Sequence, residues 1–379
     1  MADLKDHASR AHALLSASSS SRWLKCPPSA VAASLYPAQD TVFTREGTLA
    51  HEVAEARVRG GEIDFSANPE ITTEMITCAD GYADYIREQI AGDASVVLLE
   101  QRLDFSPWVP KGFGTGDCLI LQDRQLHVID YKFGQGVAVD AVGNSQMRLY
   151  GLGAYNDFGF TYDIDEVVLH IYQPRLNNVS VERLSIADLL AWGEEIKPVA
   201  ALAAKGKGDM CSGPHCRFCP HAGACPKLAE DCMKVVKVGR CKAQVRELAP
   251  WMVADILAEE PVISSWLKAV KDRALAVLLN GEEIPGYKVV EGKLGNRKWS
   301  DEAKVAEALA AAGYGREDYT ETKLRSPSGM DKAIGKKKVA ELLSSLIDRS
   351  PGAPAVVPES DKRKPYDHQE ASRKAFEEN

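Results

Sequence analysis

The fold is constrained most strongly by one short apolar run, Leu126–Ile129, which ends in Asp130-Tyr131-Lys132. A run of this kind, with little polar alternation, is typical of a central strand that neighbouring elements bury on both faces. Because residues i and i+2 of a strand point to the same face, the side chains of Asp130 and Lys132 should project together. Charged side chains are seldom buried without a partner, so the sequence predicts an α/β core with a polar site at this strand end.

A second acidic residue, Asp117, lies near the start of the preceding candidate strand, Gly114–Leu121. A tight turn at Asp123-Arg124 would join the two strands antiparallel and place Asp117 roughly opposite Asp130. Two carboxylates and one ammonium group suit phosphodiester hydrolysis, because oxygen ligands hold Mg²⁺ or Mn²⁺ and a bound ion lowers the pKa of its water. The alternative interpretation is a solvated face, where charged residues two apart are common.

The rest of the pattern divides the chain into three parts. Apolar periodicity predicts helices over 45–59, 72–91, 139–156 and 186–203, and strands over 96–103 and 167–172. Further along, the sequence favours helices over 245–280 and 301–346, with a β-hairpin over 287–299. We therefore expect a first domain over 1–240, a mainly helical C-terminal region over 241–349, and a disordered tail over 350–379, which is rich in proline and charge.

The composition is that of an ordinary globular protein, with 45% hydrophobic and 26% charged residues among 379. No stretch approaches the ~18 consecutive apolar residues that a membrane helix needs. The first ten residues lack the apolar segment of a signal peptide, so we expect a cytoplasmic protein without a membrane partner. The net charge of -8 counts against a protein that binds nucleic acid. It does not exclude one, because binding to phosphate needs only a local basic strip.

Three of the nine cysteines stand close together in a turn-forming segment, as Cys216-x2-Cys219-x5-Cys225. In a reducing compartment such a cluster favours metal ligation over disulfide bonds. Either tetrahedral zinc or a [4Fe-4S] cluster needs a fourth ligand. The near candidate is Cys211, and the distant one is Cys26.

Three segments together resemble the RecB-like branch of the PD-(D/E)XK nucleases: Gly114-Thr115-Gly116-Asp117, Asp130-Tyr131-Lys132 and Gln146-Met147-Arg148-Leu149-Tyr150. Upstream, Gly47-Thr48-Leu49-Ala50-His51 is similar to the Gly-x-x-x-His element of that branch. The resemblance implies a restriction-endonuclease-like core, in which helices flank a central mixed sheet. It also implies metal binding by His51, Asp117 and Asp130, catalysis by Asp117, Asp130 and Lys132, and placement of nucleic acid by Gln146 and Tyr150. For Glu100, which precedes these segments, the sequence leaves open a place near the metal site, but we do not count it as a ligand and expect a solvated strand residue.

The segment from Ser19 to Pro27 resembles the opening of RecB-like nucleases that carry an iron–sulfur clasp. This resemblance implies that Cys26 joins Cys216, Cys219 and Cys225 as the ligands of a structural [4Fe-4S] cluster, with Zn²⁺ as the alternative. A cluster that ties these positions together closes a very long loop, which constrains the unfolded chain and pins the two ends of the domain.

The resemblance to RecB-like nucleases covers roughly residues 14–235, and the remainder is similar to a phage- and prophage-associated family of nucleases. It implies a metal-dependent deoxyribonuclease, most simply an exonuclease on DNA ends or single strands. The setting would be phage DNA recombination, replication or repair, with DNA and phage recombination or replication proteins as partners. The alternatives are a nucleic-acid-binding protein without catalysis and a zinc or iron–sulfur interaction module. The sequence leaves the oligomeric state open.

Overall fold

The structure is a computed structural model that describes residues 13–37, 41–61, 68–92, 94–122, 124–238 and 250–290, together with a few positions beyond 300. The chain divides into two compact units, residues 1–295 and 296–379. In the second unit, the 3-10 helix η6 (Ser344–Leu346) is described. All other elements named below belong to the first unit.

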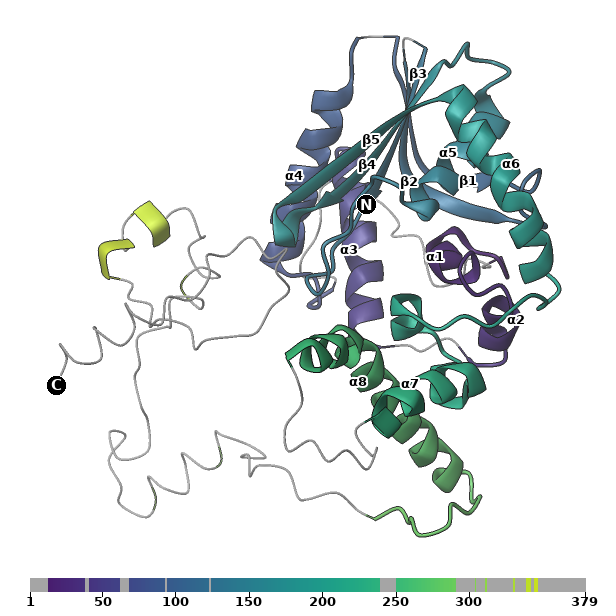
Figure 1. The fold of residues 1–379 in the computed structure, drawn as a ribbon. Coiled ribbons are helices and arrows are strands. Elements are labelled where there is room, and N and C mark those ends of the chain that lie inside the picture. Colours follow the sequence, from purple (N-terminus) through teal and green to yellow (C-terminus); the bar gives the residue numbers. More distant parts are fainter. Residues whose placement is uncertain are drawn as a thin grey trace. The chain divides into compact units, whose positions relative to one another are not determined.

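The described residues form one five-stranded mixed sheet in the order β1-β2-β3-β4-β5. Its strands are β1 (Val96–Asp104), β2 (Phe113–Gln122), β3 (Gln125–Tyr131), β4 (Glu166–Gln173) and β5 (Asn178–Ser185) (Figure 1). Strands β3 and β4 run parallel, whereas the other neighbours are antiparallel. The predicted α/β architecture with a central mixed sheet flanked by helices is therefore confirmed.

Two pairs of helices cover the two faces of the sheet (Figure 1). Helices α3 (Val42–Val58) and α4 (Thr73–Gln89) pack on one face, where alternate residues such as Ile120 and Ile129 point. Helices α5 (Ser145–Phe158) and α6 (Ile186–Ala203) pack on the other, against Leu121 and Val128 among others. Because successive strand residues face opposite sides, strands buried on both faces read as apolar runs.

Helix α5 begins later than its apolar pattern predicts, at Ser145 and not at Val139. The side chain of Asn144 accepts hydrogen bonds from the backbone N–H groups of Gln146 and Met147, so it caps the helix at this point. The expected hairpin over 287–299 lies largely outside the described residues, and residues 287–290 are not a strand. The expected tail over 350–379 lies wholly outside them, as does most of the expected helical stretch over 301–346.

The N-terminal segment packs beside the α5 face of the sheet. It comprises the 3-10 helix η2 (Ala17–Ser19), helix α1 (Ser20–Trp23) and helix α2 (Ser29–Ser34). The Trp23 side chain is fully buried in the core, and its indole N–H donates to the Ser16 carbonyl at 3.1 Å. This anchor brings the segment after α1, which contains Cys26, back towards the body of the domain.

The cysteine-rich loop follows helix α6 and contains two 3-10 helices, η4 (Pro214–Phe218) and η5 (Ala222–Ala224). Another 3-10 helix, η3 (Pro174–Leu176), lies earlier in the chain, between β4 and β5. The cysteine-rich loop leads into α7 (Pro226–Val238) and is covered by α8 (Pro250–Leu279). A Cβ atom on Gly223 would lie 2.4 Å from the Ala269 carbonyl oxygen, so only glycine allows η5 to approach α8 this closely. Trp266 of α8 and Leu228 of α7 complete a small apolar core beneath the loop.

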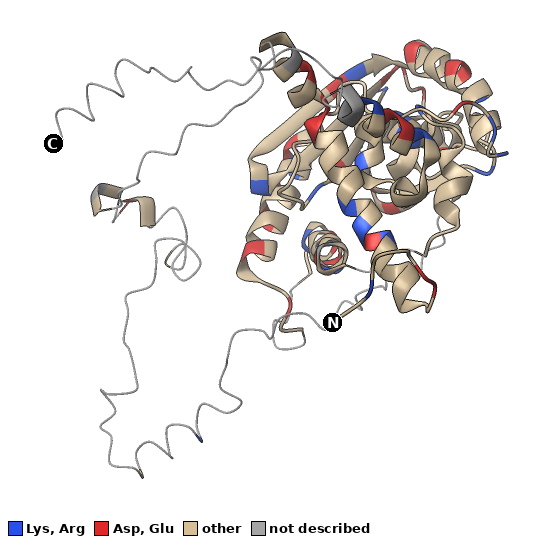
Figure 2. Ribbon diagram, turned by 60° about the horizontal axis from the view of Figure 1, so that its bottom comes forward, with Lys and Arg blue, Asp and Glu red and all other residues tan. Residues whose placement is uncertain are grey.

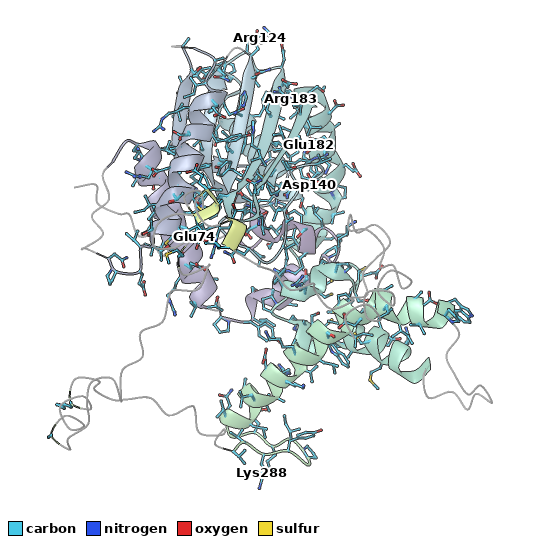
Figure 3. The ribbon with its side chains drawn as sticks, turned by 90° about the vertical axis from the view of Figure 1, so that its left-hand side faces the viewer. Glu74, Arg124, Asp140, Glu182, Arg183 and Lys288 are labelled. Carbon is cyan, nitrogen blue, oxygen red and sulfur yellow. The ribbon has the colours of Figure 1, made fainter. Side chains whose placement is uncertain are left out.

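Charged residues are spread over the first unit, with basic and acidic positions interspersed along its helices and strands (Figure 2). Arg124, in the turn between β2 and β3, lies at the opposite end of the sheet from Glu74 of α4 (Figure 3). Among the described helices, none combines the length and the apolar character that a bilayer crossing requires.

Candidate active site and cysteine site

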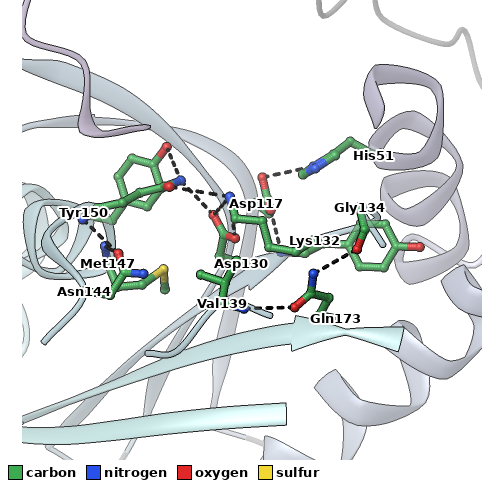
Figure 4. A network of polar contacts seen from close by, with 12 residues as sticks. His51, Asp117, Asp130, Lys132, Gly134, Val139, Asn144, Met147, Tyr150 and Gln173 are labelled. Carbon is green, nitrogen blue, oxygen red and sulfur yellow. Dashed lines mark hydrogen bonds and ion pairs between the residues drawn. The ribbon is translucent and has the colours of Figure 1, made fainter. Parts of the chain in front are cut away.

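The pairing of β2 with β3 brings two aspartates side by side. The last paired residues towards this end of the two strands are Cys118 and Ile129, so Asp117 and Asp130 follow them in the same register. The backbone N–H of Tyr131 donates to Asp117 Oδ2 at 2.7 Å, which fixes this carboxylate against β3 (Figure 4). The Asp130 carboxylate is almost fully buried. The structure thus places both aspartates where the tight turn and the apolar run suggested.

Lys132 lies at the same strand end and contacts one of these carboxylates. Its Nζ is 2.9 Å from Asp130 Oδ2, and it donates to Asp130 Oδ1 at 3.3 Å (Figure 4). The backbone N–H of Lys132 donates to the Tyr172 carbonyl at 2.9 Å, which continues the parallel pairing of β3 with β4 by one residue. This extended backbone keeps Lys132 on the face of β3 that carries Asp130.

A histidine and a glutamate meet Asp117 from two other elements. His51 of α3 places its Nδ1 3.3 Å from Asp117 Oδ1. One potential ligand atom from each of His51, Glu100 and Asp117 lies within 4.8 Å of the other two. Three such atoms at this spacing can share one divalent ion.

Glu100 was expected to be a solvated strand residue, whereas it is half-buried and belongs to this group. It stands opposite Asp117 in the pairing of β1 with β2, at the one position where the ladder is interrupted. Its φ of 54° lies in the left-handed region, which is uncommon for a residue other than glycine. Only the register of β1 against β2 reveals this neighbour, and no local pattern around Glu100 signals it.

Helix α5 delivers an amide and a phenol to the same site. Gln146 Nε2 donates to Asp130 Oδ1 at 3.1 Å, and its Oε1 accepts from Lys132 Nζ at 3.5 Å. Gln146 Nε2 also lies within hydrogen-bond distance of the Tyr150 hydroxyl, at 3.4 Å. A Cβ atom on Gly114 would stand 2.7 Å from the Tyr150 ring, so glycine at this point of β2 leaves room for the phenol. The six residues singled out by the sequence therefore converge on one strand end.

Burial and neighbouring charges move the two carboxylates in opposite directions. Burial works to raise the pKa of Asp117, but His51, Lys132 and the Tyr131 N–H outweigh it, so the pKa of Asp117 is lowered. The pKa of Asp130 is raised, because its burial and the charge of Asp117 outweigh the attraction of Lys132. An added cation would favour the ionised form of both carboxylates.

The two bases at the site keep their protons more firmly than usual. Burial works to lower the pKa of His51, but the two aspartates outweigh it and the pKa is raised. For Lys132 burial also acts downward, and Asp130 and Asp117 again produce a raised pKa. A metal ion that binds the His51 nitrogen facing Asp117 must therefore displace a proton that His51 holds and the ionised Asp117 stabilises.

The loop between Lys132 and α5 is fixed by hydrogen bonds to one buried side-chain amide. Gln173, at the end of β4, donates to the carbonyl of Gly134 at 2.8 Å (Figure 4) and to that of Val137 at 2.9 Å. Its Oε1 accepts from the Val139 N–H at 3.1 Å. The Gln173 side chain is 2% exposed. Sequence reasoning missed this residue, because its role depends on a loop that it meets only in the folded chain.

The cysteine-rich loop closes over the distant cysteine. Cys26, Cys211, Cys216, Cys219 and Cys225 line one pocket, together with His215, His221 and residues of α1, α2 and α7. Burial raises the pKa of the Cys216 thiol to about 11, and the other three sulfurs act in the same direction. Burial also raises the pKa of Cys219, and the Arg22 guanidinium is among the groups that oppose this rise.

The nearer candidate, Cys211, has a different environment. It is exposed, and its thiol donates to the Ser212 carbonyl at 3.7 Å. Its backbone N–H instead donates to Cys26 Sγ at 3.5 Å. Two histidines near the pocket are engaged elsewhere, since His215 Nε2 lies 2.8 Å from the Cys211 carbonyl and His221 Nδ1 lies 3.1 Å from the Tyr36 hydroxyl.

Comparisons with known proteins show a family and a weak likeness to a solved structure. A family model described as "Protein of unknown function (DUF2800)" matches residues 12–364. A solved structure titled "Crystal structure of SSO0001" aligns with a TM-score of 0.28 and 14% sequence identity. The alignment covers 59% of this chain and 92% of that one.

Proposed function

The chain belongs to the DUF2800 family, and we propose that it is a metal-dependent deoxyribonuclease of the RecB-like PD-(D/E)XK kind. One observation carries the proposal: Asp117, Asp130 and Lys132 meet at the end of a buried strand pair, where His51 also reaches Asp117. Two carboxylates that can hold a divalent ion, with an ammonium group beside them, suit metal-assisted cleavage of a phosphodiester. The order of these residues in the sequence supports the same family of nucleases.

The residues that would hold the ion fit its chemistry. His51, Glu100 and Asp117 offer one imidazole nitrogen and two carboxylate oxygens within a single ion's reach, and Asp130 stands beside them. Oxygen-rich sites suit Mg²⁺ and Mn²⁺, and an imidazole ligand is compatible with Mn²⁺. Bound there, the ion would polarise the scissile phosphate and lower the pKa of a bound water.

The protein's own groups hold and orient the reacting atoms. Lys132 stays protonated, because Asp130 and Asp117 raise its pKa in spite of its burial, so its ammonium can stabilise negative charge that develops on phosphate. Gln146 accepts from Lys132 and donates to Asp130, and it therefore fixes the distance between the two. The Tyr150 hydroxyl beside Gln146 can contact a nucleotide that approaches from the α5 side.

The proposed substrate is DNA with free ends or single strands, and the proposed reaction is exonucleolytic. The support is the resemblance, which also suggests a role in phage DNA recombination, replication or repair beside other phage proteins. The charge distribution allows this, since basic positions occur among acidic ones throughout the first unit (Figure 2). Binding through a few phosphate contacts should weaken steeply as salt is added.

We further propose that Cys26, Cys216, Cys219 and Cys225 hold a [4Fe-4S] cluster. Cys26 and Cys211 both line the pocket, but Cys26 is buried, whereas Cys211 is exposed and its thiol donates to the Ser212 carbonyl. A single Zn²⁺ needs its thiolates at about 2.3 Å from one point. Within the described part of the chain, His51, Glu100 and Asp117 are the residues that bring three ligand atoms within 4.8 Å of one another. The cysteine sulfurs are spaced more widely than that, which favours a multi-iron cluster over one Zn²⁺.

A nuclease assay with a matched lysine control tests the proposal. The protein is purified without oxygen and incubated with end-labelled single-stranded DNA and Mn²⁺, beside the variants Lys132→Ala and Lys197→Ala. Lys197 lies on α6 and pairs with Glu194 at the surface. We expect degradation by the wild type and by Lys197→Ala, and none by Lys132→Ala.

The other outcomes separate the competing functions. DNA retention without cleavage by the wild type would support a binding protein without catalysis. Neither retention nor cleavage would leave the interaction module, in which the acidic group is incidental. Equal cleavage by Lys132→Ala and the wild type would remove the proposed site while leaving a nuclease.

A further inference from the structure

Two polar groups in the cysteine pocket have no hydrogen-bond partner. Within the described residues, Arg22 Nε and Ser29 Oγ are buried and unpaired. Both residues line the pocket that Cys26, Cys216 and Cys219 share. A buried donor without a partner costs free energy, so a native structure seldom keeps one unless a water or a ligand satisfies it.

Both groups are fixed relative to Cys26 by the backbone. The Cys26 N–H donates to the Arg22 carbonyl at 2.8 Å, and the Ser29 N–H donates to the Cys26 carbonyl at 2.9 Å. Arg22 belongs to α1 and Ser29 begins α2, so the two donors flank the cysteine on either side. Helix α1 also contacts η4, which contains Cys216. The segment therefore presents one sulfur ligand and two unsatisfied donors to the same space.

We propose that Arg22 and Ser29 donate hydrogen bonds to the sulfur atoms of the group that the four cysteines hold. Thiolates and inorganic sulfides accept hydrogen bonds and carry negative charge, whereas a guanidinium offers only donors and a positive charge. The inference rests on the proposed [4Fe-4S] cluster. It adds two residues that stabilise the cluster without binding iron.

The reduction potential of the cluster reports such contacts directly. Hydrogen bonds to the sulfurs and the net charge nearby are among the factors that set the potential of an iron–sulfur cluster. Reduction adds negative charge, so donors and cations stabilise the reduced form more than the oxidised form. Arg22 and Ser29 should both raise the potential, and Arg22 should contribute more because it carries charge.

Four variants of the full chain, purified without oxygen, test this assignment. Arg22→Gln removes the charge, Arg22→Lys keeps the charge without the planar guanidinium, and Ser29→Ala removes the hydroxyl. Arg217→Gln is the matched control, because this arginine is exposed, lies outside the pocket lining, and places its guanidinium 5.2 Å from the Phe218 ring. The readouts are iron per chain and the midpoint potential, followed by electron paramagnetic resonance of the reduced cluster.

The expected result is a more negative midpoint for Arg22→Gln and a smaller negative shift for Ser29→Ala, with Arg217→Gln unchanged. Arg22→Lys should fall between the wild type and Arg22→Gln. If Arg22→Gln retains no iron, the Ser29→Ala and Arg22→Lys potentials decide. Potentials equal to that of Arg217→Gln would overturn the inference and leave the cluster in place. A wild type without iron would instead overturn the cluster itself, which separates the two failures.

Discussion

Two histidines inside the sheet should make the protein sensitive to mild acid. His127 of β3 and His170 of β4 are buried and stacked, with His127 Nδ1 3.0 Å from His170 Nε2. The outer nitrogen of His170 lies 2.8 Å from the Tyr85 hydroxyl, and that of His127 lies 3.2 Å from the Gln122 amide. Two neutral imidazoles can each donate one hydrogen bond and accept another along this row of polar groups. Two imidazolium ions would instead place two N–H donors and two positive charges against each other.

The magnitude follows from the pKa values of the pair. Burial lowers the pKa of His127 from 6.5 to about 4, and burial together with the charge of His127 lowers that of His170 to about 3. When the pKa of a histidine is lower in the folded state than in the unfolded state, the histidine does not change the free energy of unfolding at pH values above its unfolded-state pKa. Stability then falls as the pH drops from the unfolded to the folded pKa, because the unfolded chain binds the extra proton. At pH 5 this amounts to about 2 kcal/mol per histidine, or about 4 kcal/mol for the pair.

Urea unfolding of the metal-free protein at pH 7 and pH 5 measures this loss. The transition to follow is that of the first unit, which contains both histidines. His127→Gln keeps polar atoms near His170 but cannot gain a proton, so its acid loss should be smaller by about 2 kcal/mol. Titration of the acidic groups is common to the wild type and His127→Gln and cancels between the two proteins. An acid loss equal in the wild type and in His127→Gln would refute the reasoning.

Three further changes test the surroundings of the site. Gln173→Ala should lower the free energy of unfolding by about 1–3 kcal/mol in urea titrations, because three hydrogen bonds to the loop after Lys132 are lost. Asp130→Asn should abolish cleavage yet raise the melting temperature in EDTA, since burial raises the pKa of this carboxyl and its charge opposes folding; a lower melting temperature would contradict this. Cys26→Ser should lose the brown colour and iron that Cys211→Ser keeps, and the reverse result would make Cys211 the fourth ligand.

The part of the site that the sequence predicts is the part set by short-range geometry. Asp117 and Asp130 flank a tight turn, so an apolar run and a turn signal are enough to place them opposite each other. Gln146 and Tyr150 are four residues apart, which puts them on one face of any helix. These relations need no knowledge of how distant segments pack.

The part that the sequence does not predict depends on longer-range pairing. Glu100 lies near Asp117 because of the register of β1 against β2. Residues 105–112, which connect these two strands, carry no turn signal as clear as Asp123-Arg124 between β2 and β3. Strand β5 escaped prediction because it is a largely polar strand at the edge of the sheet, which β4 holds by pairing. Gln173 holds a loop whose last part, from Val139, the apolar pattern assigns to the helix that begins at Ser145 in the structure. The unpaired donors of Arg22 and Ser29 likewise emerge only once the cysteine pocket is assembled.

We propose above all that one divalent ion binds at the C-terminal end of β3, beside Asp130, with an imidazole among its ligands. Mn²⁺ bound to the protein can be examined by pulsed electron paramagnetic resonance, which detects a coordinated nitrogen through its coupling to the metal electrons. We expect one Mn²⁺ with nitrogen coupling in the wild type, loss of that coupling in His51→Gln, and weaker Mn²⁺ binding in Asp117→Asn and Glu100→Gln. Nitrogen coupling that persists in His51→Gln, or Mn²⁺ affinity unaffected by Asp117→Asn, would contradict the proposed metal site.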